Sequence, residues 1–189
     1  MEKRGLRAEL EARGLTTSRG LAWADEMRVG LIGQTRRVWA SVGVKVVQAV
    51  EYVYQWQYLV LAVNGVSGRL WWDWTSGMTS RALADVVAQW GVQGISTVVW
   101  DRARGHGGAV YDAIPVHRIE QPAYSPELNP AERVFEWLRS QIEGVVYGTL
   151  DAKREAVERA LRELNASPDR IQRLAGWAWI REALTGFCE

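Results

Sequence analysis

The sequence feature that most constrains the fold is the apolar run ISTVVWD at residues 95–101, which ends in a carboxylate. A continuous apolar stretch of this kind is typical of a strand that is buried on both faces of a sheet. It follows the segment TSRALADVVAQWG (79–91), in which apolar residues recur at helical spacing. A helix that leads directly into a buried strand predicts a right-handed crossover onto a sheet that helices cover on both sides.

Further strands and helices are expected around this central strand. Segments rich in β-branched and aromatic residues, with partial alternation, indicate strands, and the glycines of GVSG (65–68) indicate a turn. Strands are expected at 21–31, 44–54, 57–64, 69–75, 95–101 and 116–121. Helices are expected at 2–13, 79–91, 107–113, 128–143, 150–165 and 168–184. A meander of strands followed by helix-crossed strands predicts an α/β fold with a mixed sheet flanked by helices.

Composition limits the class of protein further. The 189 residues suffice for one domain with a substantial core, and the eleven tryptophans are expected mainly to pack that core. The formal net charge of +1 at pH 7 provides no global field for nucleic acid, so DNA binding would depend on local patches. The single cysteine, Cys188, fits a reducing cytoplasm, and the absence of a long apolar run predicts no membrane span.

Three carboxylates stand at positions where the predicted fold can bring them together. Asp25 lies in the first strand, Asp101 ends the central strand, and Glu132 lies in the first turn of a helix. If the two strands are parallel neighbours, the aspartates are about 5 Å apart across the ladder. Carboxylates this close repel one another unless a cation neutralises them, and Mg²⁺ or Mn²⁺ prefers such oxygen ligands. The pattern therefore predicts a divalent metal site.

The stretch QPAYSPELNPAERVFEWLRS (121–140) restricts the backbone just before Glu132. Pro126 and Pro130 limit the conformations of the turn, which would hold the acid in place for metal ligation. Glu127 competes for the same ligand role from within the turn, whereas Glu136 is expected to pair with a neighbouring arginine or with water. Each acid also has a simpler interpretation, since aspartates often end strands and glutamates favour helix starts.

The motif YSPELNPAE and the aromatic amphipathic run after it resemble the C-terminal catalytic motif of DDE transposases. The mariner-like family of bacterial insertion sequences is the nearest resemblance. ADEMRVGL followed by RRVWA resembles the first-aspartate region of that family, and VVWDRARGH resembles the second. The order and spacing of these motifs cover roughly residues 21–145.

This resemblance implies an RNase H-like fold with a mixed five-stranded sheet. It implies that Asp25, Asp101 and Glu132 are the catalytic, metal-binding acids, and that two Mg²⁺ or Mn²⁺ ions support DNA strand cleavage and strand transfer. The implied partners are transposon-end and target DNA and a second copy of the chain in a homodimer. Residues 1–20 would be a short helical extension and residues 21–189 the catalytic domain, without the helix-turn-helix domains that usually precede it.

Several basic residues are candidates for contact with DNA. Arg28, Arg36 and Arg37 cluster near the first acid together with Lys45, although a solvated charged face explains them equally well. His106, five residues after Asp101, could contact the scissile phosphate or orient a ligand, or it could be an ordinary loop residue. His117 lies within a predicted strand and is expected to be structural.

Two alternatives to an active transposase domain stay open from the sequence. One is a catalytically inactive or truncated remnant that acts only in DNA binding or assembly. The other is a different RNase H-like nuclease, for example one that cleaves RNA–DNA hybrids, which the YSPELNP motif disfavours.

Overall fold

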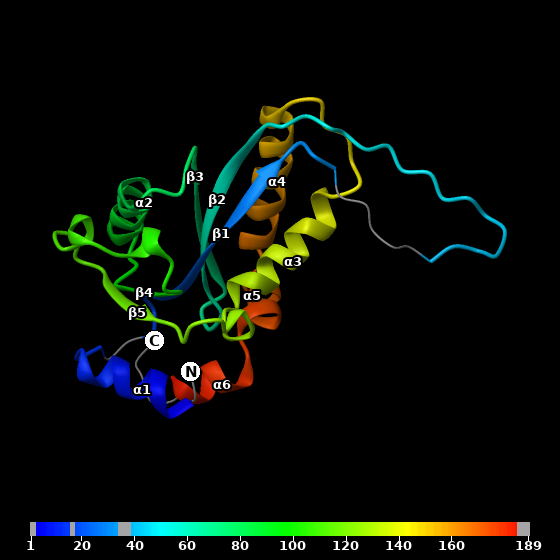
Figure 1. The fold of residues 1–189 in the computed structure, drawn as a ribbon. Helices are drawn as coiled ribbons and strands as arrows, with labels where there is room; N and C mark the ends of the chain where they lie inside the picture. The colour runs from blue at the N-terminus through cyan, green and yellow to red at the C-terminus, as the bar shows by residue number, and fades with distance from the viewer. Residues whose placement is uncertain (1–2, 16–17, 34–38, 185–189) are drawn as a thin grey trace.

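The computed structural model describes residues 3–15, 18–33 and 39–184 of the chain. Its centre is a five-stranded sheet with the strand order β3-β2-β1-β4-β5 (Figure 1). β1 pairs antiparallel with β2 and parallel with β4, which confirms the predicted mixed sheet and the crossover through α2. The strands are β1 (Leu21–Gly30), β2 (Trp56–Asn64), β3 (Arg69–Thr75), β4 (Thr97–Trp100) and β5 (His117–Glu120).

Helices cover both faces of this sheet, as the buried central strand predicts (Figure 1). α2 packs on one face, and the remaining helices contribute to the larger core on the other face. The helices are α1 (Lys3–Ala12), α2 (Ser80–Val92), α3 (Ala131–Ile142), α4 (Leu150–Asn165), α5 (Pro168–Ala175) and α6 (Ala178–Ala183). Short 3₁₀ turns are η1 (Arg104–His106), η2 (Ala109–Tyr111) and η3 (Pro126–Leu128).

The side chains of β1 divide between the two cores in strict alternation. Leu21 and Trp23 are buried in the core under α3 to α6, whereas Ala22 and Ala24 are buried in the core under α2. This period of two places the successive acids of β1 on opposite faces of the sheet. The first strand can therefore present a carboxylate to each side.

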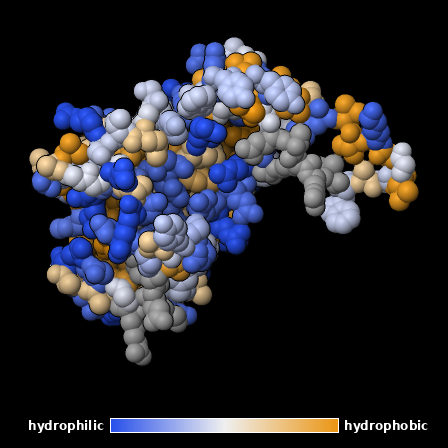
Figure 2. All heavy atoms as spheres, in the orientation of Figure 1, coloured by the Kyte–Doolittle hydropathy of each residue, from blue (hydrophilic) through white to orange (hydrophobic). Residues whose placement is uncertain are grey.

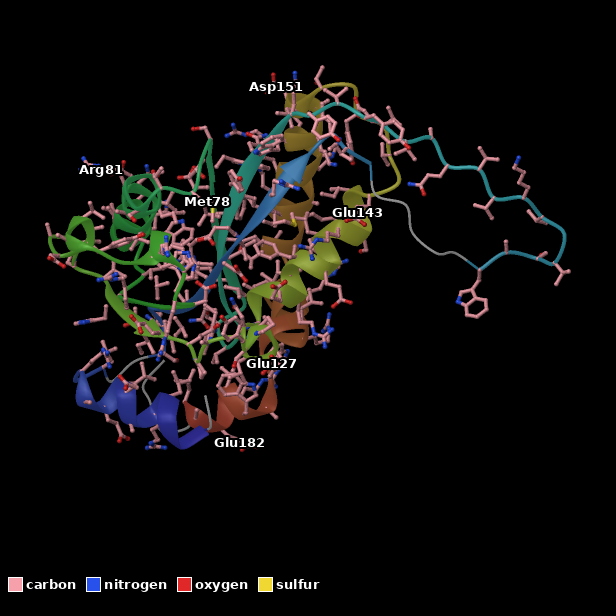
Figure 3. All side chains as sticks on the ribbon, in the orientation of Figure 1. Met78, Arg81, Glu127, Glu143, Asp151 and Glu182 are labelled. Carbon is pink, nitrogen blue, oxygen red and sulfur yellow. The ribbon has the colours of Figure 1, made fainter. Side chains whose placement is uncertain are left out.

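The predicted strand at 44–54 is wrong. Residues 39–55, which we call the arm, form no strand and extend away from the body of the molecule between β1 and β2 (Figure 1). Side chains of the arm project into solvent, and apolar residues gather along it (Figures 2 and 3). Val47 is 81% exposed and Tyr54 is 79% exposed. The β-branched and aromatic composition is that of a strand, but both edges of β1 are already paired with β2 and β4, so the arm gains no partner there.

The predicted single helix at 168–184 is also wrong, because the chain breaks into α5 and α6 around Gly176. A Cβ atom at Gly176 would lie 2.3 Å from the carbonyl oxygen of Gly65, in the turn between β2 and β3. The two backbones thus approach too closely for any side chain, and the helix ends there.

Other elements match their predictions with small changes in length. The helix predicted at 107–113 is only the 3₁₀ turn η2, and α2 runs one residue past Gly91, where we expected it to stop. Gly94 instead has a positive φ of 103°, which reverses the chain into β4. Among the described residues, no helix is both long and apolar enough to cross a membrane.

Candidate active site

The structure brings Asp25, Asp101 and Glu132 to the lining of one cavity of about 390 Å³, which we call the acid cavity. Asp25 comes from β1, and Asp101 follows the last residue of β4. Trp23 of β1 pairs with Val99 of β4 in parallel register, and each aspartate follows two residues after its member of this pair. Glu132 reaches the same cavity from the first turn of α3.

Asn129 attaches the start of α3 to the first strand. Its side chain is buried, and its amide nitrogen donates to the Ala24 carbonyl at 3.1 Å and to Asp25 Oδ2 at 3.0 Å. Its amide oxygen accepts a hydrogen bond from the Ala131 backbone at 3.1 Å. Asn129 therefore fixes the start of α3 relative to Asp25. The sequence indicated this restraint through Pro126 and Pro130 alone and did not predict the role of Asn129.

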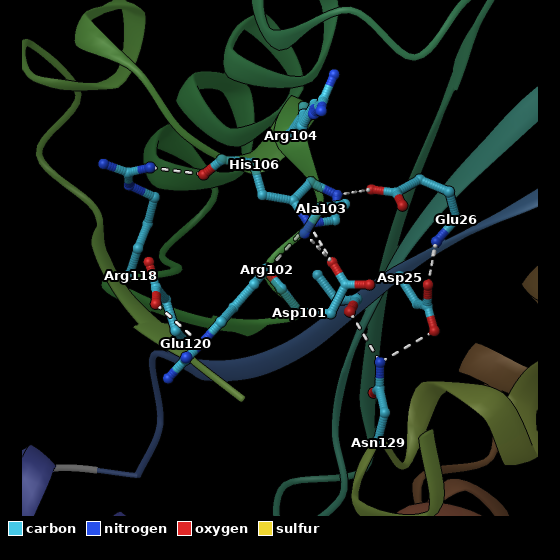
Figure 4. A network of polar contacts seen from close by, with 12 residues as sticks. Asp25, Glu26, Asp101, Arg102, Ala103, Arg104, His106, Arg118, Glu120 and Asn129 are labelled. Atoms are coloured by element: carbon cyan, nitrogen blue, oxygen red, sulfur yellow. Dashed lines mark hydrogen bonds and ion pairs between the residues drawn. The ribbon is translucent and has the colours of Figure 1, made fainter. Parts of the chain in front are cut away.

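The Asp25 carboxyl is held from two sides and has an unusual acidity. Oδ2 accepts from Asn129, and Oδ1 accepts from the Glu26 backbone nitrogen at 2.8 Å (Figure 4). Burial raises the pKa of Asp25 from 3.8 to about 7; the hydrogen bond from the Glu26 backbone opposes this rise, and the nearby negative charges of Glu26, Glu132 and Asp101 add to it. A carboxyl with this pKa is half ionised near neutral pH, and a bound cation would favour its ionised form.

Asp101 is the more exposed of the two aspartates, and its Oδ1 atom is fixed by two neighbours. The backbone nitrogen of Ala103 donates to it at 2.9 Å, and His106 Nδ1 lies 2.6 Å away (Figure 4). In the described part of the chain, no hydrogen bond or ion pair involves the other carboxylate oxygen of Asp101 or the carboxylate of Glu132. These oxygens are available to bind a ligand in the acid cavity.

His106 is not an ordinary loop residue, because its ring is buried and lies between two carboxylates. Nε2 lies 2.9 Å from Glu26 Oε1 on the side opposite Asp101. Burial by itself would lower the pKa of His106, but the hydrogen bond and charge of Glu26 and the charge of Asp101 outweigh it and raise the pKa above 6.5. Sequence reasoning missed Glu26, although its place on the same β1 face as the apolar Ala22 and Ala24 marked it as a buried acid.

The donor set of the acid cavity suits a hard divalent cation. Three carboxylates from three segments of the chain supply only oxygen atoms, as Mg²⁺ and Mn²⁺ prefer. Burial is the main cause of the raised pKa of Asp25, and the negative charges of Glu26, Glu132 and Asp101 add to it. Within the residues that the structure describes, no three Asp, Glu, His or Cys side chains are yet close enough to hold one ion together. The residues fit a metal ion, provided that the carboxylates move toward it on binding.

The other carboxylates proposed from the sequence lie outside the acid cavity. Glu127 lies on the exposed turn η3, before the start of α3 (Figure 3). Glu136 forms an ion pair of 2.7 Å with Arg133, as expected.

The structure describes two of the four basic residues that the sequence suggested as a cluster near the first acid, Arg28 and Lys45. Arg28 lies in a separate cavity of about 280 Å³, with its guanidinium 5.5 Å from the centre of the Trp56 ring. Arg36 and Arg37 lie outside the described residues, and Lys45 is exposed on the arm. His117 is exposed on β5.

Arginines beside Asp101 were not among the predicted DNA contacts. Arg102 and Arg104 line a further cavity of about 490 Å³ next to the acid cavity, together with Arg118. Arg118 donates to the His106 carbonyl at 2.6 Å, and Arg102 pairs with Glu120 at 3.1 Å (Figure 4). The sequence RARGH, directly after the central strand, already places two arginines close to Asp101 in the chain.

Comparison with solved structures identifies the fold. The Mos1 transposase paired-end complex with left transposon end matches with a TM-score of 0.67 and 11% identity, over 98% of this chain and 61% of that one. The Mos1 mariner paired-end complex with Mn matches with a TM-score of 0.66 and 12% identity, over 98% and 62%. The catalytic domain of Mos1 mariner transposase matches with a TM-score of 0.63 and 10% identity, over 96% and 86%.

The chain therefore has the RNase H-like fold of the mariner transposase catalytic domain, and it spans 61% of the length of the chain in the first of these complexes. No family model and no curated protein sequence matches it.

Proposed function

We propose that this chain is the catalytic domain of a mariner-like DDE transposase, which cleaves DNA strands and joins them to a target with divalent metal ions. The observation that supports this most is the convergence of Asp25, Asp101 and Glu132 on one cavity within a mariner-type fold. Residues 21–189 would form this domain, with 1–20 as a short helical extension. The single cysteine of the sequence fits action in the cytoplasm.

In this proposal Asp25, Asp101 and Glu132 hold two Mg²⁺ or Mn²⁺ ions, which when bound activate the attacking oxygen and stabilise the leaving oxygen. A structural neighbour solved with Mn supports the divalent requirement. Asn129 orients Asp25 through the hydrogen bond to Oδ2, and the Ala103 backbone nitrogen orients Asp101. Asp25 must lose its proton to become a ligand, so metal binding would release protons near neutral pH.

The chemical steps would be two displacements at phosphorus. A water oxygen attacks the scissile phosphate, and the bond to the 3′ oxygen breaks to leave a free 3′-hydroxyl. That hydroxyl then attacks a phosphate of target DNA and displaces another 3′ oxygen, with no covalent enzyme intermediate. Arg102 and Arg104 beside the acid cavity are placed to contact the DNA backbone, together with the predicted Arg28, Arg36 and Arg37.

DNA is the proposed substrate, since two of the structural neighbours are described as transposase complexes with paired ends. We further propose that the working form is a homodimer, because paired ends require two active sites. Sedimentation of the chain with and without end DNA would test the dimer directly.

The test of catalysis is a nicking assay on supercoiled plasmid with Mg²⁺ or Mn²⁺, combined with calorimetric titration of Mn²⁺. We expect Asp25→Asn, Asp101→Asn and Glu132→Gln each to abolish nicking and to weaken Mn²⁺ binding. Glu127→Gln is the matched control, because this glutamate is close in sequence to Glu132 but does not line the acid cavity. If the three substitutions leave Mn²⁺ binding unchanged, the inactive-remnant alternative replaces this proposal.

A further inference from the structure

A buried histidine connects the acid cavity to a carboxylate that lies on the opposite face of β1. His106 Nδ1 lies 2.6 Å from Asp101 Oδ1, and Nε2 lies 2.9 Å from Glu26 Oε1 (Figure 4). The side chains of His106 and Glu26 are only 4% and 7% exposed, whereas that of Asp101 is 56% exposed. The three groups thus form a chain of contacts that runs from the interior to the edge of the cavity.

The histidine ring is fixed by more than its two carboxylate partners. The Trp100 ring stacks on it, with centroids 4.0 Å apart and planes inclined by 23°. Arg118 donates to the backbone carbonyl of His106 at 2.6 Å, and the Tyr111 hydroxyl donates to the carbonyl of Gly105 at 2.8 Å. With the ring plane and the backbone both held, the ring nitrogens have little freedom to change partners.

Glu26 occupies a position where an apolar side chain would be expected. Its neighbours on the same face of β1, Ala22 and Ala24, belong to the core beneath α2. A buried carboxylate costs free energy unless it is paired, and among the described residues its side chain makes its hydrogen bond to His106. If Glu26 and His106 only filled this core, apolar residues could replace the two at little cost in stability. The contact of His106 with Asp101 therefore indicates a role beyond packing.

The contact with Asp101 uses one oxygen and leaves the other available. His106 and the Ala103 backbone nitrogen both contact Oδ1, and no hydrogen bond or ion pair within the described residues engages Oδ2. Two contacts on one oxygen fix the rotation of the carboxylate, so that Oδ2 keeps one orientation. Partners of ligating carboxylates in this position typically change metal affinity by about 10- to 100-fold.

We propose that Glu26 and His106 form a positioning pair, in which Glu26 holds the imidazole and the imidazole holds Asp101 in the orientation that binds a divalent cation. This inference rests on the proposed function, because it assigns the pair to the metal site of that function. Neither residue contacts the cation or the DNA. Glu26 acts only through His106, and this distinguishes it from a fourth ligand.

The test is a double-mutant cycle on Mn²⁺ affinity, measured by calorimetry on the full chain. Glu26→Gln keeps the size of the side chain and removes its charge, and we expect it to weaken Mn²⁺ binding about 10-fold. His106→Gln should weaken binding at least as much, since its amide can reach Glu26 but not Asp101. The double variant should bind no more weakly than His106→Gln alone, because Glu26 then has nothing to act through.

A matched control and a second measurement separate positioning from simple loss of stability. Glu120→Gln removes an exposed carboxylate near the same cavities and should leave Mn²⁺ affinity unchanged. In nitrogen NMR spectra, Glu26→Gln should shift the ring signals of His106 and leave those of His117, the only other histidine, in place. The NMR measurement requires no metal and reports on any variant that folds.

The outcomes distinguish this inference from the proposed function. If Asp101→Asn abolishes Mn²⁺ binding while Glu26→Gln and His106→Gln bind like the wild type, the positioning pair is refuted and the metal site stands. If the two substitutions weaken binding additively, Glu26 does not act through His106 and the inference also fails. If Asp101→Asn itself binds Mn²⁺ normally, the proposed metal site is wrong and the pair has no site to serve.

Discussion

Replacing Asp25 with asparagine should stabilise the metal-free protein while removing its metal response. The pKa of Asp25 rises from 3.8 to about 7 on folding, mainly because of burial. Each pKa unit corresponds to about 1.4 kcal/mol, so ionised Asp25 costs the native state about 4 kcal/mol above pH 7. The introduced amide has one acceptor oxygen in place of two, so it loses the hydrogen bond from Asn129, which costs about 1 kcal/mol. The expected net gain in unfolding free energy is therefore about 3 kcal/mol at pH 8.

The pH dependence of this gain has a definite sign. Between pH 4 and 7 the native state keeps a proton on Asp25 that the unfolded state has lost, so wild-type stability falls as the pH rises through this range. The Asp25→Asn variant lacks this decline, so its stability curve should cross that of the wild type as the pH falls and lie about 1 kcal/mol below it at low pH, where only the lost hydrogen bond counts. Mn²⁺ should reverse the order at pH 8 by stabilising only the wild type.

The assay is urea denaturation from pH 4 to 8, with either a chelator or Mn²⁺. Asp73→Asn is the matched control, because Asp73 accepts a hydrogen bond from the following backbone nitrogen at 2.7 Å, as Asp25 does at 2.8 Å. We expect the Asp73 variant to show neither the gain at pH 8 nor the loss of the Mn²⁺ response. An Asp25→Asn variant that is less stable than the wild type in chelator at pH 8 would refute this reasoning.

Three further predictions concern the scaffold around the site. Gly65→Ala should lower the unfolding free energy by several kcal/mol in chemical denaturation, because its Cβ would lie 2.3 Å from a carbonyl oxygen of α5. Gly77→Ala should leave the unfolding free energy unchanged, because no atom lies within 4 Å of the added Cβ. Glu158→Gln should reduce stability at neutral pH and flatten the decline of stability in acid. Burial alone would raise the pKa of Glu158, but the hydrogen bonds from two β3 indoles and an arginine outweigh it and lower that pKa. Glu155→Gln, at an exposed position, is the control in the same pH series. Thr149→Ala should lower the melting temperature through the loss of about 1 kcal/mol, because its side chain caps α4.

Much of the sheet could be predicted because its strands carry local patterns of burial. The apolar run ending at Asp101 and the alternation through Asp25 predicted the strands that bear two of the acids, and both strands form as expected. The motif around Glu132 predicted the third acid and its helix. The positions of the acids could be predicted because each acid lies at the end or in the interior of a helix or strand, and the spacing of apolar residues in the sequence indicates that helix or strand.

What could not be predicted depends on partners that are distant in sequence. The contact between Glu26 and His106 joins residues 80 positions apart, and no local pattern encodes it. The arm has the composition of a strand, but a strand also needs an edge with which to pair. Gly176 divides the last predicted helix because the turn of Gly65 lies against it, which is again a fact of packing between distant segments.

The arm also has a consequence for the integrity of the chain. It is part of the covalent link between β1 and β2, yet these strands are also joined by backbone pairing from Trp23 with Val63 to Gly30 with Trp56. Scission at Val47 by a protease would therefore divide the polypeptide without dividing the sheet. The nicked molecule should migrate as one particle in gel filtration and as two fragments after denaturation, and new termini introduced at this point should yield a permuted chain with the same sheet.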